Sequence, residues 1–293
     1  MYYLRRFDPW RSPLCTCPPK YSLSPYTGCS HMCLYCYATA YIGVKKSRPK
    51  RDLLVKLERD LRRADPSLPV SMSNSSDPYP PEEASEGLTR RVLKLLLSRG
   101  FKVILVTKSD LVIRDLDLLV GSPVTVSVTV TTLDDSLAAR MEPGAPPPSK
   151  RLSAIQRLSE EGVPVSVRID PVVPGLNDDS EDLRELVREV RDSGALHVVT
   201  SSYKARPDNL SRMCRAFPDR AELWRELYKK RGRWTRGYWY LPLGLRARML
   251  KPIVEEARRL GLTYATCREG LTDPRFFNAP SCDGTHLIPD VRR

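Results

Sequence analysis

Short apolar runs, rich in β-branched residues, alternate with longer amphipathic stretches from about residue 22 to about residue 202. This alternation is typical of successive βα units around a parallel sheet. We predict strands at residues 22–26, 70–74, 102–107, 124–130, 163–170 and 197–202. We predict helices at residues 38–63, 82–98, 112–119, 150–161 and 180–193. The fold class is therefore α/β, and six strands with five intervening helices indicate a partial barrel.

The predicted strands also indicate which side chains face the barrel interior. Valine occupies every second position from Val124 to Val130, and Ser or Thr occupies the positions between. The next strand repeats this alternation, with Arg168 and Asp170 on its polar side. Because successive side chains of a strand point to opposite faces, we expect the valines beneath the outer helices. A closed barrel would fill its centre with bulky apolar side chains, so this interior is predicted to hold something polar.

The pattern changes after residue 202, where basic amphipathic segments replace the alternation. These segments lie at residues 210–231 and 245–260, followed by a short extended stretch at residues 262–266 and a loop-rich tail. We divide the chain into an N-terminal segment (1–21), a partial barrel (22–205) and a basic helical extension (206–293).

Composition narrows the functional classes. The 293 residues are 41% hydrophobic, enough for a full-sized core. No apolar run is long enough to span a bilayer, and the N-terminus lacks the apolar core of a signal peptide, so we expect a cytoplasmic, monomeric protein without membrane contact. Lys and Arg outnumber Asp and Glu by 48 to 35, and such an excess attracts polyanions, nucleic acid above all. Thermophilic ion-pair networks are the alternative, but they do not explain the imbalance.

Three closely spaced cysteines, Cys29, Cys33 and Cys36, form the most informative motif. Thiolates are the ligands of iron–sulfur clusters, and three of them on a short loop leave the fourth iron of a cube without a protein ligand. Structural zinc is the alternative, but zinc sites close with four ligands arranged as two short pairs. Eight cysteines in a reducing compartment also indicate metal binding rather than disulfides.

The cysteine spacing, with Gly28 before it and Tyr35 before its last member, resembles the cluster loop of the radical S-adenosylmethionine (SAM) enzymes. Over about residues 24–178 the chain resembles the spore photoproduct lyase-like branch of that superfamily. The motifs are Ser24-Pro25-Tyr26-Thr27-Gly28-Cys29, Tyr35-Cys36-Tyr37, Ser73-Asn74-Ser75-Ser76-Asp77-Pro78-Tyr79-Pro80, Leu105-Val106-Thr107-Lys108-Ser109, Arg114-Asp115, Arg140-Met141-Glu142-Pro143 and Pro174-Gly175-Leu176-Asn177-Asp178. The resemblance implies a (β/α)6 partial barrel with SAM and the cluster at the carboxyl ends of the strands.

The resemblance also implies the chemistry. A [4Fe–4S] cluster on the three cysteines binds SAM through its open iron. One electron, supplied by an external donor, splits the sulfonium to a 5′-deoxyadenosyl radical, which abstracts hydrogen from the substrate. The implied SAM contacts are Tyr35 beside the adenine, Ser76, Lys108 or Arg168 at the carboxylate, and Ser127 and Thr129 at the ribose. Tyr35 and Tyr37 match a tyrosine pair of the lyase and are either a hydrogen relay or packing residues.

One departure from the lyase pattern bears on the reaction. The cysteine that returns a hydrogen atom in the lyase is replaced here by Asn74, and an amide cannot deliver a hydrogen atom. Spore photoproduct reversal is therefore not expected. We prefer RNA base modification over DNA lesion repair for this reason.

A second group of cysteines lies outside the barrel motifs. Cys15 and Cys17 precede the first strand, whereas Cys267 and Cys282 lie in the tail. Four thiols suit either an auxiliary [4Fe–4S] cluster or a structural zinc ion. Burial without any ligand role is the alternative, because cysteine is often buried.

Basic and aromatic residues interleave at residues 229–240, where they offer phosphate contacts and flat surfaces for unstacked bases. The candidate nucleic-acid contacts are Lys45, Lys46, Arg231, Arg233, Trp234 and Arg236. A solvated helix end beside core aromatics is the alternative. We therefore predict a radical SAM enzyme that acts on nucleic acid. The alternatives are a radical SAM enzyme for a peptide or small metabolite, and a non-catalytic, zinc-containing nucleic-acid-binding protein.

Overall fold

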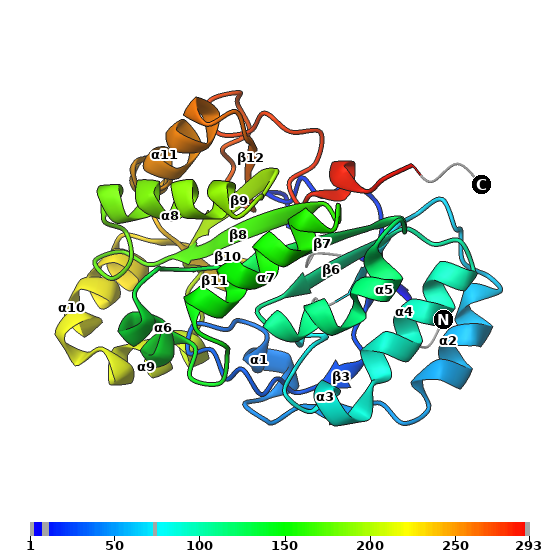
Figure 1. Ribbon diagram of the computed structural model, residues 1–293. Coiled ribbons are helices and arrows are strands. Elements are labelled where there is room, and N and C mark those ends of the chain that lie inside the picture. The colour runs from blue at the N-terminus through cyan, green and yellow to red at the C-terminus, as the bar shows by residue number, and fades with distance from the viewer. Residues whose placement is uncertain (1–2, 8–11, 73–74, 291–293) are drawn as a thin grey trace.

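The computed structural model describes residues 3–7, 12–72 and 75–290, so Asn74 lies outside the described residues. Within them, one sheet has the strand order β1-β2-β5-β6-β7-β8-β9-β12 (Figure 1). Its strands are β1 (Arg5–Arg6), β2 (Tyr21–Leu23), β5 (Val70–Met72), β6 (Val103–Thr107), β7 (Val124–Thr129), β8 (Val165–Val172), β9 (His197–Ser202) and β12 (Thr263–Thr266). Strand β1 runs antiparallel to β2, and the other neighbours are parallel.

The six strands predicted from the sequence are confirmed as the centre of this sheet. Strand β12, within the predicted extended stretch at 262–266, pairs with β9 and extends the sheet beyond the predicted barrel strands. Two small hairpin-like pairs lie outside the sheet. They are β3 (Tyr26–Thr27) with β4 (Arg48–Pro49) and β10 (Arg233–Thr235) with β11 (Tyr238–Tyr240).

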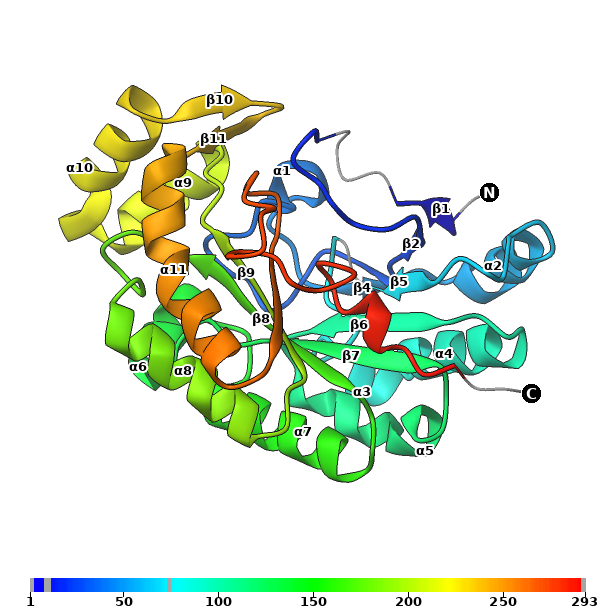
Figure 2. The same cartoon turned by 90° about the horizontal axis from the view of Figure 1, so that it is seen from above.

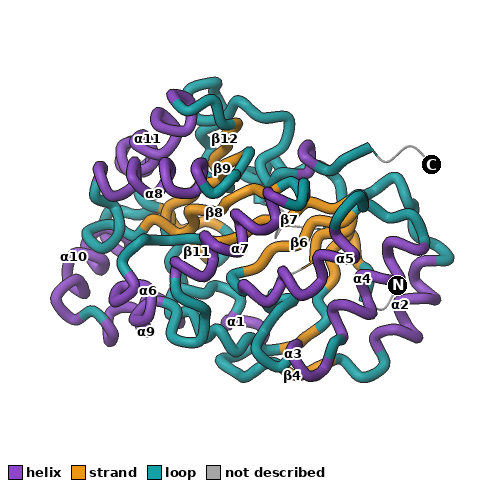
Figure 3. The backbone as a smooth tube through the Cα atoms, in the orientation of Figure 1, coloured by secondary structure: helices purple, strands orange, loops and turns teal. Residues whose placement is uncertain are grey.

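Helices cover the outer face of the sheet, and loops cover the inner one (Figures 2 and 3). The longer helices are α2 (Leu53–Leu61), α4 (Leu88–Ser98), α7 (Pro148–Glu160), α8 (Ser180–Asp192), α9 (Pro207–Ala216) and α11 (Leu243–Arg259). The shorter ones are α1 (Thr39–Ile42), α3 (Glu83–Glu86), α5 (Leu116–Leu119), α6 (Asp135–Met141) and α10 (Ala221–Trp224). Short 3₁₀ helices occupy Asp110–Asp115, Pro218–Arg220 and Thr285–Leu287, and a π-helix occupies Arg225–Lys230.

The prediction of one helix at residues 38–63 is wrong. Gly43 adopts a left-handed φ of 73° and ends α1 after four residues. Strand β4 then pairs with β3, and Pro49 within it has no amide hydrogen for a continuing helix. The segment returns to helix only at α2, so a single helical turn and a short strand replace the long helix that was predicted.

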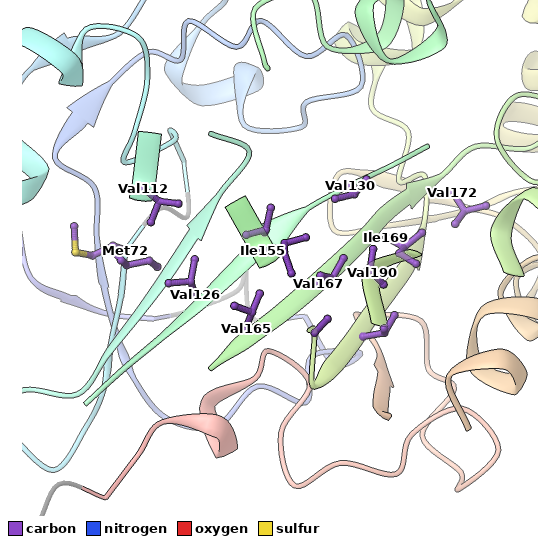
Figure 4. Close-up of a cluster of buried hydrophobic side chains, with 14 of the residues drawn as sticks. Met72, Val112, Val126, Val130, Ile155, Val165, Val167, Ile169, Val172 and Val190 are labelled. Atoms are coloured by element: carbon purple, nitrogen blue, oxygen red, sulfur yellow. The ribbon is translucent and has the colours of Figure 1, made fainter. Parts of the chain in front are cut away.

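The valine face of the central strands packs against the outer helices, as predicted (Figure 4). Val126 and Val130 lie in the same buried cluster as Ile155 of α7 and Val190 of α8, and all four are fully buried. Burial of a side chain of this size contributes about 1.5–3 kcal/mol. This apolar layer fixes the strands and leaves their opposite face to polar residues.

The C-terminal tail runs back along the inner face of the sheet, on the side opposite α7 and α8 (Figure 2). Its Gly284 lies so close to Ser166 of β8 that a Cβ there would come within 2.9 Å of the serine hydroxyl oxygen. The tail therefore covers the inner face of β8 near the amino end of that strand. In the described part of the chain, no helix is long and apolar enough to cross a membrane.

Candidate functional site

A cavity of about 610 Å³ lies on the inner face, at the carboxyl ends of the central strands. The cysteine motif, the N-terminal segment, the loop after β12 and the C-terminal tail complete its wall. Its size is within the range of small-molecule and cofactor sites. The cavity therefore lies where the resemblance implies SAM and the cluster, at the carboxyl ends of the parallel strands.

The cysteine motif forms a tight loop at this cavity. Cys29, Cys33 and Cys36 are free thiols, and all three line the cavity. The loop begins at Gly28, whose φ is 74° and whose missing Cβ would overlap the Lys46 carbonyl oxygen. The Cys29 amide donates to the Lys45 carbonyl at 2.9 Å. Only glycine fits this close approach, and the loop is held against the segment that follows it.

The donor set of this loop suits an iron–sulfur cluster. Burial raises the pKa of Cys29 to about 11, with a further contribution from Asp77, and burial also holds the pKa of Cys33 well above its usual value. Metal binding displaces these protons, because the ligands are thiolates. Among the described residues, no three His, Cys, Asp or Glu side chains converge as ligands of one metal ion. A cube instead spreads its thiolates over several iron atoms.

A buried carboxylate, Glu142, fixes the cysteine loop through a hydrogen bond from Tyr35. It accepts a hydrogen bond from the Tyr35 hydroxyl and another from the Thr131 hydroxyl at 3.2 Å. Its ion-pair partners are Arg151 at 2.5 Å and Lys108 at 4.0 Å. Although burial opposes its charge, Lys108 and Arg151 keep the pKa of Glu142 below its usual value. The ring of Tyr35 is thereby fixed, with the Lys108 ammonium 5.6 Å from its centroid.

Asp77 holds the other side of the loop. Its carboxylate accepts from the Thr107 hydroxyl at 2.6 Å and from the Lys108 amide at 2.8 Å. The same carboxylate lies 3.2 Å from His31 Nδ1, within the cysteine loop. Burial opposes ionisation, but these partners keep the pKa of Asp77 below its usual value. His31 Nε2 is buried and has no hydrogen-bond partner among the described residues.

Charged side chains of β8 and of the segment after β9 form the far wall. Arg168 pairs with Asp170 at 2.6 Å, and Asp170 also accepts from the Ser201 hydroxyl at 2.5 Å. Lys204 pairs with the buried carboxylate of Glu269 at 2.9 Å. Burial opposes the charge of Asp170, but Arg168 and then Lys204 hold its pKa below the usual value. The wall therefore carries fixed cations that face the cavity.

Most of the residues assigned to SAM from the sequence meet at this cavity. Its lining includes Tyr35, Tyr37, Ser76, Lys108, Thr129 and Arg168. The Ser76 hydroxyl donates to the Tyr26 carbonyl at 2.9 Å. Ser127 is not among the lining residues and is fully buried, two residues deeper along β7 than Thr129. Its hydroxyl has no hydrogen-bond partner among the described residues, and its role as a SAM contact stays a prediction.

Sequence reasoning missed the cationic and aromatic rim of the cavity. Arg268 is 7% exposed and has a left-handed φ of 58°, which is uncommon for a residue with a side chain. Its guanidinium lies 4.7 Å from the ring centroid of Tyr238 and 5.9 Å from that of Tyr37. It also donates to the Tyr240 hydroxyl at 3.1 Å. The only signal in the sequence was its place after Cys267, since the β11 strand that meets it was not predicted.

The four remaining candidate ligands also come together. Cys15, Cys17 and Cys267 line the cavity, and the Cys17 sulfur lies 3.3 Å from that of Cys282. Cys17, together with burial, raises the pKa of the Cys15 thiol. Cys267 is close enough to the other three to raise the pKa of Cys15 and Cys282 and to be raised in turn by Cys17. Segments 250 residues apart along the chain thus place four thiols side by side.

The predicted nucleic-acid contacts are all exposed. Lys45 and Lys46 follow the cysteine loop, and Arg231, Arg233, Trp234 and Arg236 lie in or beside the β10–β11 hairpin. Trp234 is 51% exposed, and its ring centroid lies 4.7 Å from that of Trp239. The Trp239 amide donates to the Ala205 carbonyl at 2.8 Å, which ties the hairpin to the segment after β9. The hairpin therefore stands next to the cavity wall rather than apart from it.

Comparisons with known proteins agree with this geometry. A double mutant of spore photoproduct lyase, solved with bound AdoMet and dinucleoside spore photoproduct, matches with a TM-score of 0.67 and 17% identity, covering 92% of this chain and 80% of that one. An uncharacterised protein of Mycobacterium tuberculosis H37Rv is 30% identical over 73% of this chain and 68% of its own length. The radical SAM Nalpha-GlyT isomerase of Pseudomonas phage M6 is 24% identical over 84% of this chain and 53% of its own length.

The model of the Radical SAM superfamily matches residues 23–190, which contain the last residue of β2, the cysteine loop and strands β3 to β8. Strands β9 and β12 lie beyond the matched residues. Members of this superfamily are enzymes that use a [4Fe–4S] cluster and SAM, so the non-catalytic zinc alternative is set aside. From its sequence and its fold together, the chain belongs to the radical SAM superfamily.

Proposed function

We propose that this radical SAM enzyme acts on a nucleic acid whose target nucleotide enters the cavity past the aromatic rim. One observation carries the proposal. Strand β11 places Tyr238 against Tyr37 and Arg268 at the cavity, while the next residue, Trp239, packs against the exposed Trp234 on β10. Successive residues of a strand face opposite sides, so one strand joins the cavity rim to an exposed basic and aromatic surface.

The cluster belongs on Cys29, Cys33 and Cys36 in this proposal, because they are the three free thiols of one short loop at the cavity. When bound, the cluster supplies the electron that cleaves SAM reductively to the 5′-deoxyadenosyl radical. Lys108 and Arg168 present cationic groups for the SAM carboxylate, and Ser76 and Thr129 present hydroxyls. Tyr35, held by Glu142, offers a fixed ring face rather than a mobile one.

The aromatic rim suits a flipped nucleotide. Chemistry on a base requires its removal from the stack, and each base stacked on an aromatic side chain contributes roughly 1–3 kcal/mol. Tyr37 and Tyr41 are partly exposed at the cavity lining, and Arg206 lies 4.8 Å from the Tyr238 ring centroid. The solved lyase structure that resembles this fold contains a dinucleoside lesion, which supports a substrate of the same class.

The first test is SAM cleavage by anaerobically reconstituted protein. Reduction with dithionite is expected to give 5′-deoxyadenosine from the wild type and none from Cys33→Ala. Turnover is then compared with added transfer RNA, ribosomal RNA, single-stranded DNA and duplex DNA. Stimulation by an RNA would support RNA base modification, and stimulation by DNA would favour lesion repair. No cleavage by protein with a loaded cluster, whatever nucleic acid is added, would contradict the proposal.

Binding provides the second test. The Arg233→Ala/Trp234→Ala/Arg236→Ala variant is expected to bind the stimulating nucleic acid at least about tenfold more weakly, since it loses one stacking surface and two phosphate contacts. Its matched control removes three exposed cations from the helical face, in Arg157→Ala/Arg184→Ala/Lys251→Ala. Equal affinities for both variants, or affinity that does not change with salt, would favour the peptide or metabolite alternative.

A further inference from the structure

The quartet of Cys15, Cys17, Cys267 and Cys282 has no role in the SAM chemistry described above. Its members come from the N-terminal segment, the residue after β12 and the C-terminal tail. The fold brings these segments close together: a Cβ added at Gly270 would lie only 3.3 Å from the Leu14 side chain. Three separate segments therefore place cysteine side chains in one region of the cavity wall.

Neither core packing nor a disulfide explains this arrangement. Cys15, Cys17 and Cys267 are partly exposed and line the cavity, whereas packing cysteines are buried in apolar surroundings. The Cys17 and Cys282 sulfurs lie 3.3 Å apart, beyond the 2.03–2.05 Å of a disulfide bond. The neighbouring groups are charged. Lys20, only 3% exposed, pairs with Asp283, and Arg168 lines the same cavity as Cys267.

We propose that these four cysteines hold a second [4Fe–4S] cluster, which shares the cavity with the SAM site. Four thiolates complete the ligands of such a cluster, and buried cations offset their negative charge. Zinc fits less well, because the Cys-x-Cys spacing of Cys15 and Cys17 is shorter than that of zinc ligand pairs. Cys15, Cys17 and Cys267 border the cavity, which offers the space that a multi-atom cluster requires, and Cys282 lies buried beside Cys17.

Left-handed glycines complete the loops around the quartet. Gly270 has a φ of 69° and follows Cys267 by three residues, and Gly284 has a φ of 82° and follows Cys282 by two. Such residues let the backbone turn sharply around a bound group. The cluster would tie the N-terminal segment and the tail to the barrel, so its binding would stabilise both loops. This inference does not depend on which substrate the enzyme takes.

Two complementary variants test the site after anaerobic reconstitution with iron and sulfide. Cys29→Ala/Cys33→Ala/Cys36→Ala removes the loop ligands, and Cys17→Ser/Cys282→Ser removes half of the quartet. Wild type is expected to hold about eight iron atoms per chain, and each variant about four. The reduced cluster of the triple variant is expected to give an electron paramagnetic resonance signal that SAM does not change, since all its irons have protein ligands. Cys214→Ser, outside both groups, is the matched control and should match wild type.

An iron-free triple variant would overturn the proposal, as would zinc that is present in wild type and lost from Cys17→Ser/Cys282→Ser. The triple variant leaves the quartet intact, so a misfolded double variant does not remove the test. Iron content and the resonance signal report the second cluster directly. SAM cleavage by wild type reports the proposed function, so the two can fail separately.

Discussion

Replacing Glu142 by alanine would break the buried network behind the cysteine loop. The Glu142 side chain is fully buried, and its partner Arg151 is 1% exposed. Removing one member of a buried ion pair costs about 3–5 kcal/mol, because it leaves the other charge uncompensated. Arg151 keeps hydrogen bonds to the Pro146 carbonyl at 2.8 Å and the Thr129 carbonyl at 3.1 Å, so we expect the lower end of that range. Such a loss is a large share of a typical domain's stability, about 5–15 kcal/mol.

The assay is urea unfolding of the metal-free protein, followed by far-ultraviolet circular dichroism. Glu142→Ala is expected to lower the midpoint at an unchanged slope, which indicates a change in stability alone. Glu142→Gln keeps an acceptor for the Tyr35 hydroxyl but removes the charge, so it should lie between wild type and Glu142→Ala. The matched control is Glu161→Ala, whose pair with Arg157 is exposed and should contribute less than about 1 kcal/mol. A loss for Glu142→Ala as small as that of the control would refute the reasoning.

Two further predictions address the loop and the outer layer. Gly28→Ala should destabilise the protein and lower its iron content far more than the control Gly87→Ala does. Both glycines have a positive φ, but only at Gly28 would a Cβ collide with a backbone carbonyl. Equal effects of the two substitutions would mean that this close approach is unimportant. Glu256→Gln should cost at most about 1 kcal/mol at neutral pH, since its arginine partners are exposed. Hydrogen bonds from Arg259 and then Arg188, against an opposing effect of burial, lower the pKa of Glu256 from 4.5 to about 2. The stabilisation is therefore present above pH 4.5 and lost as the pH falls toward 2, and a difference between wild type and Glu256→Gln that persists at pH 2 would contradict this account.

The central strands were predictable because their own side chains specify them. β-branched runs that alternate with Ser and Thr fit a half-buried pleated surface, whatever lies elsewhere in the chain. The cysteine loop was equally local, since three thiols within eight residues define their own site. Features that depend on neighbouring residues alone were therefore readable from the sequence.

Features that depend on contacts between distant segments could not be predicted from the sequence. Ser127 looked like an interior residue that lines the cavity, but it is fully buried, and the C-terminal tail lies against Ser166, its partner on β8. The position of Arg268 at the cavity was not predictable, because its partners Tyr37 and Tyr238 come from the cysteine motif and from a hairpin that the sequence did not predict. The helix at 38–63 failed because pairing of β4 with β3 outweighed a helical pattern.

The motifs that indicated the resemblance contain two kinds of residue: some face the cavity, and others are buried and fix the loops around it. Cys29 and Lys108 face the cavity, whereas Asp115 is fully buried behind it and accepts from the Tyr79 hydroxyl at 3.1 Å and from Arg114 at 2.9 Å. Such residues fix the loops without touching a ligand. They are required by any member that keeps the cofactor geometry, whatever its substrate. The motifs therefore specify the shared radical chemistry, and the substrate must be sought where no motif reached, at the Arg268 rim and the β10–β11 hairpin.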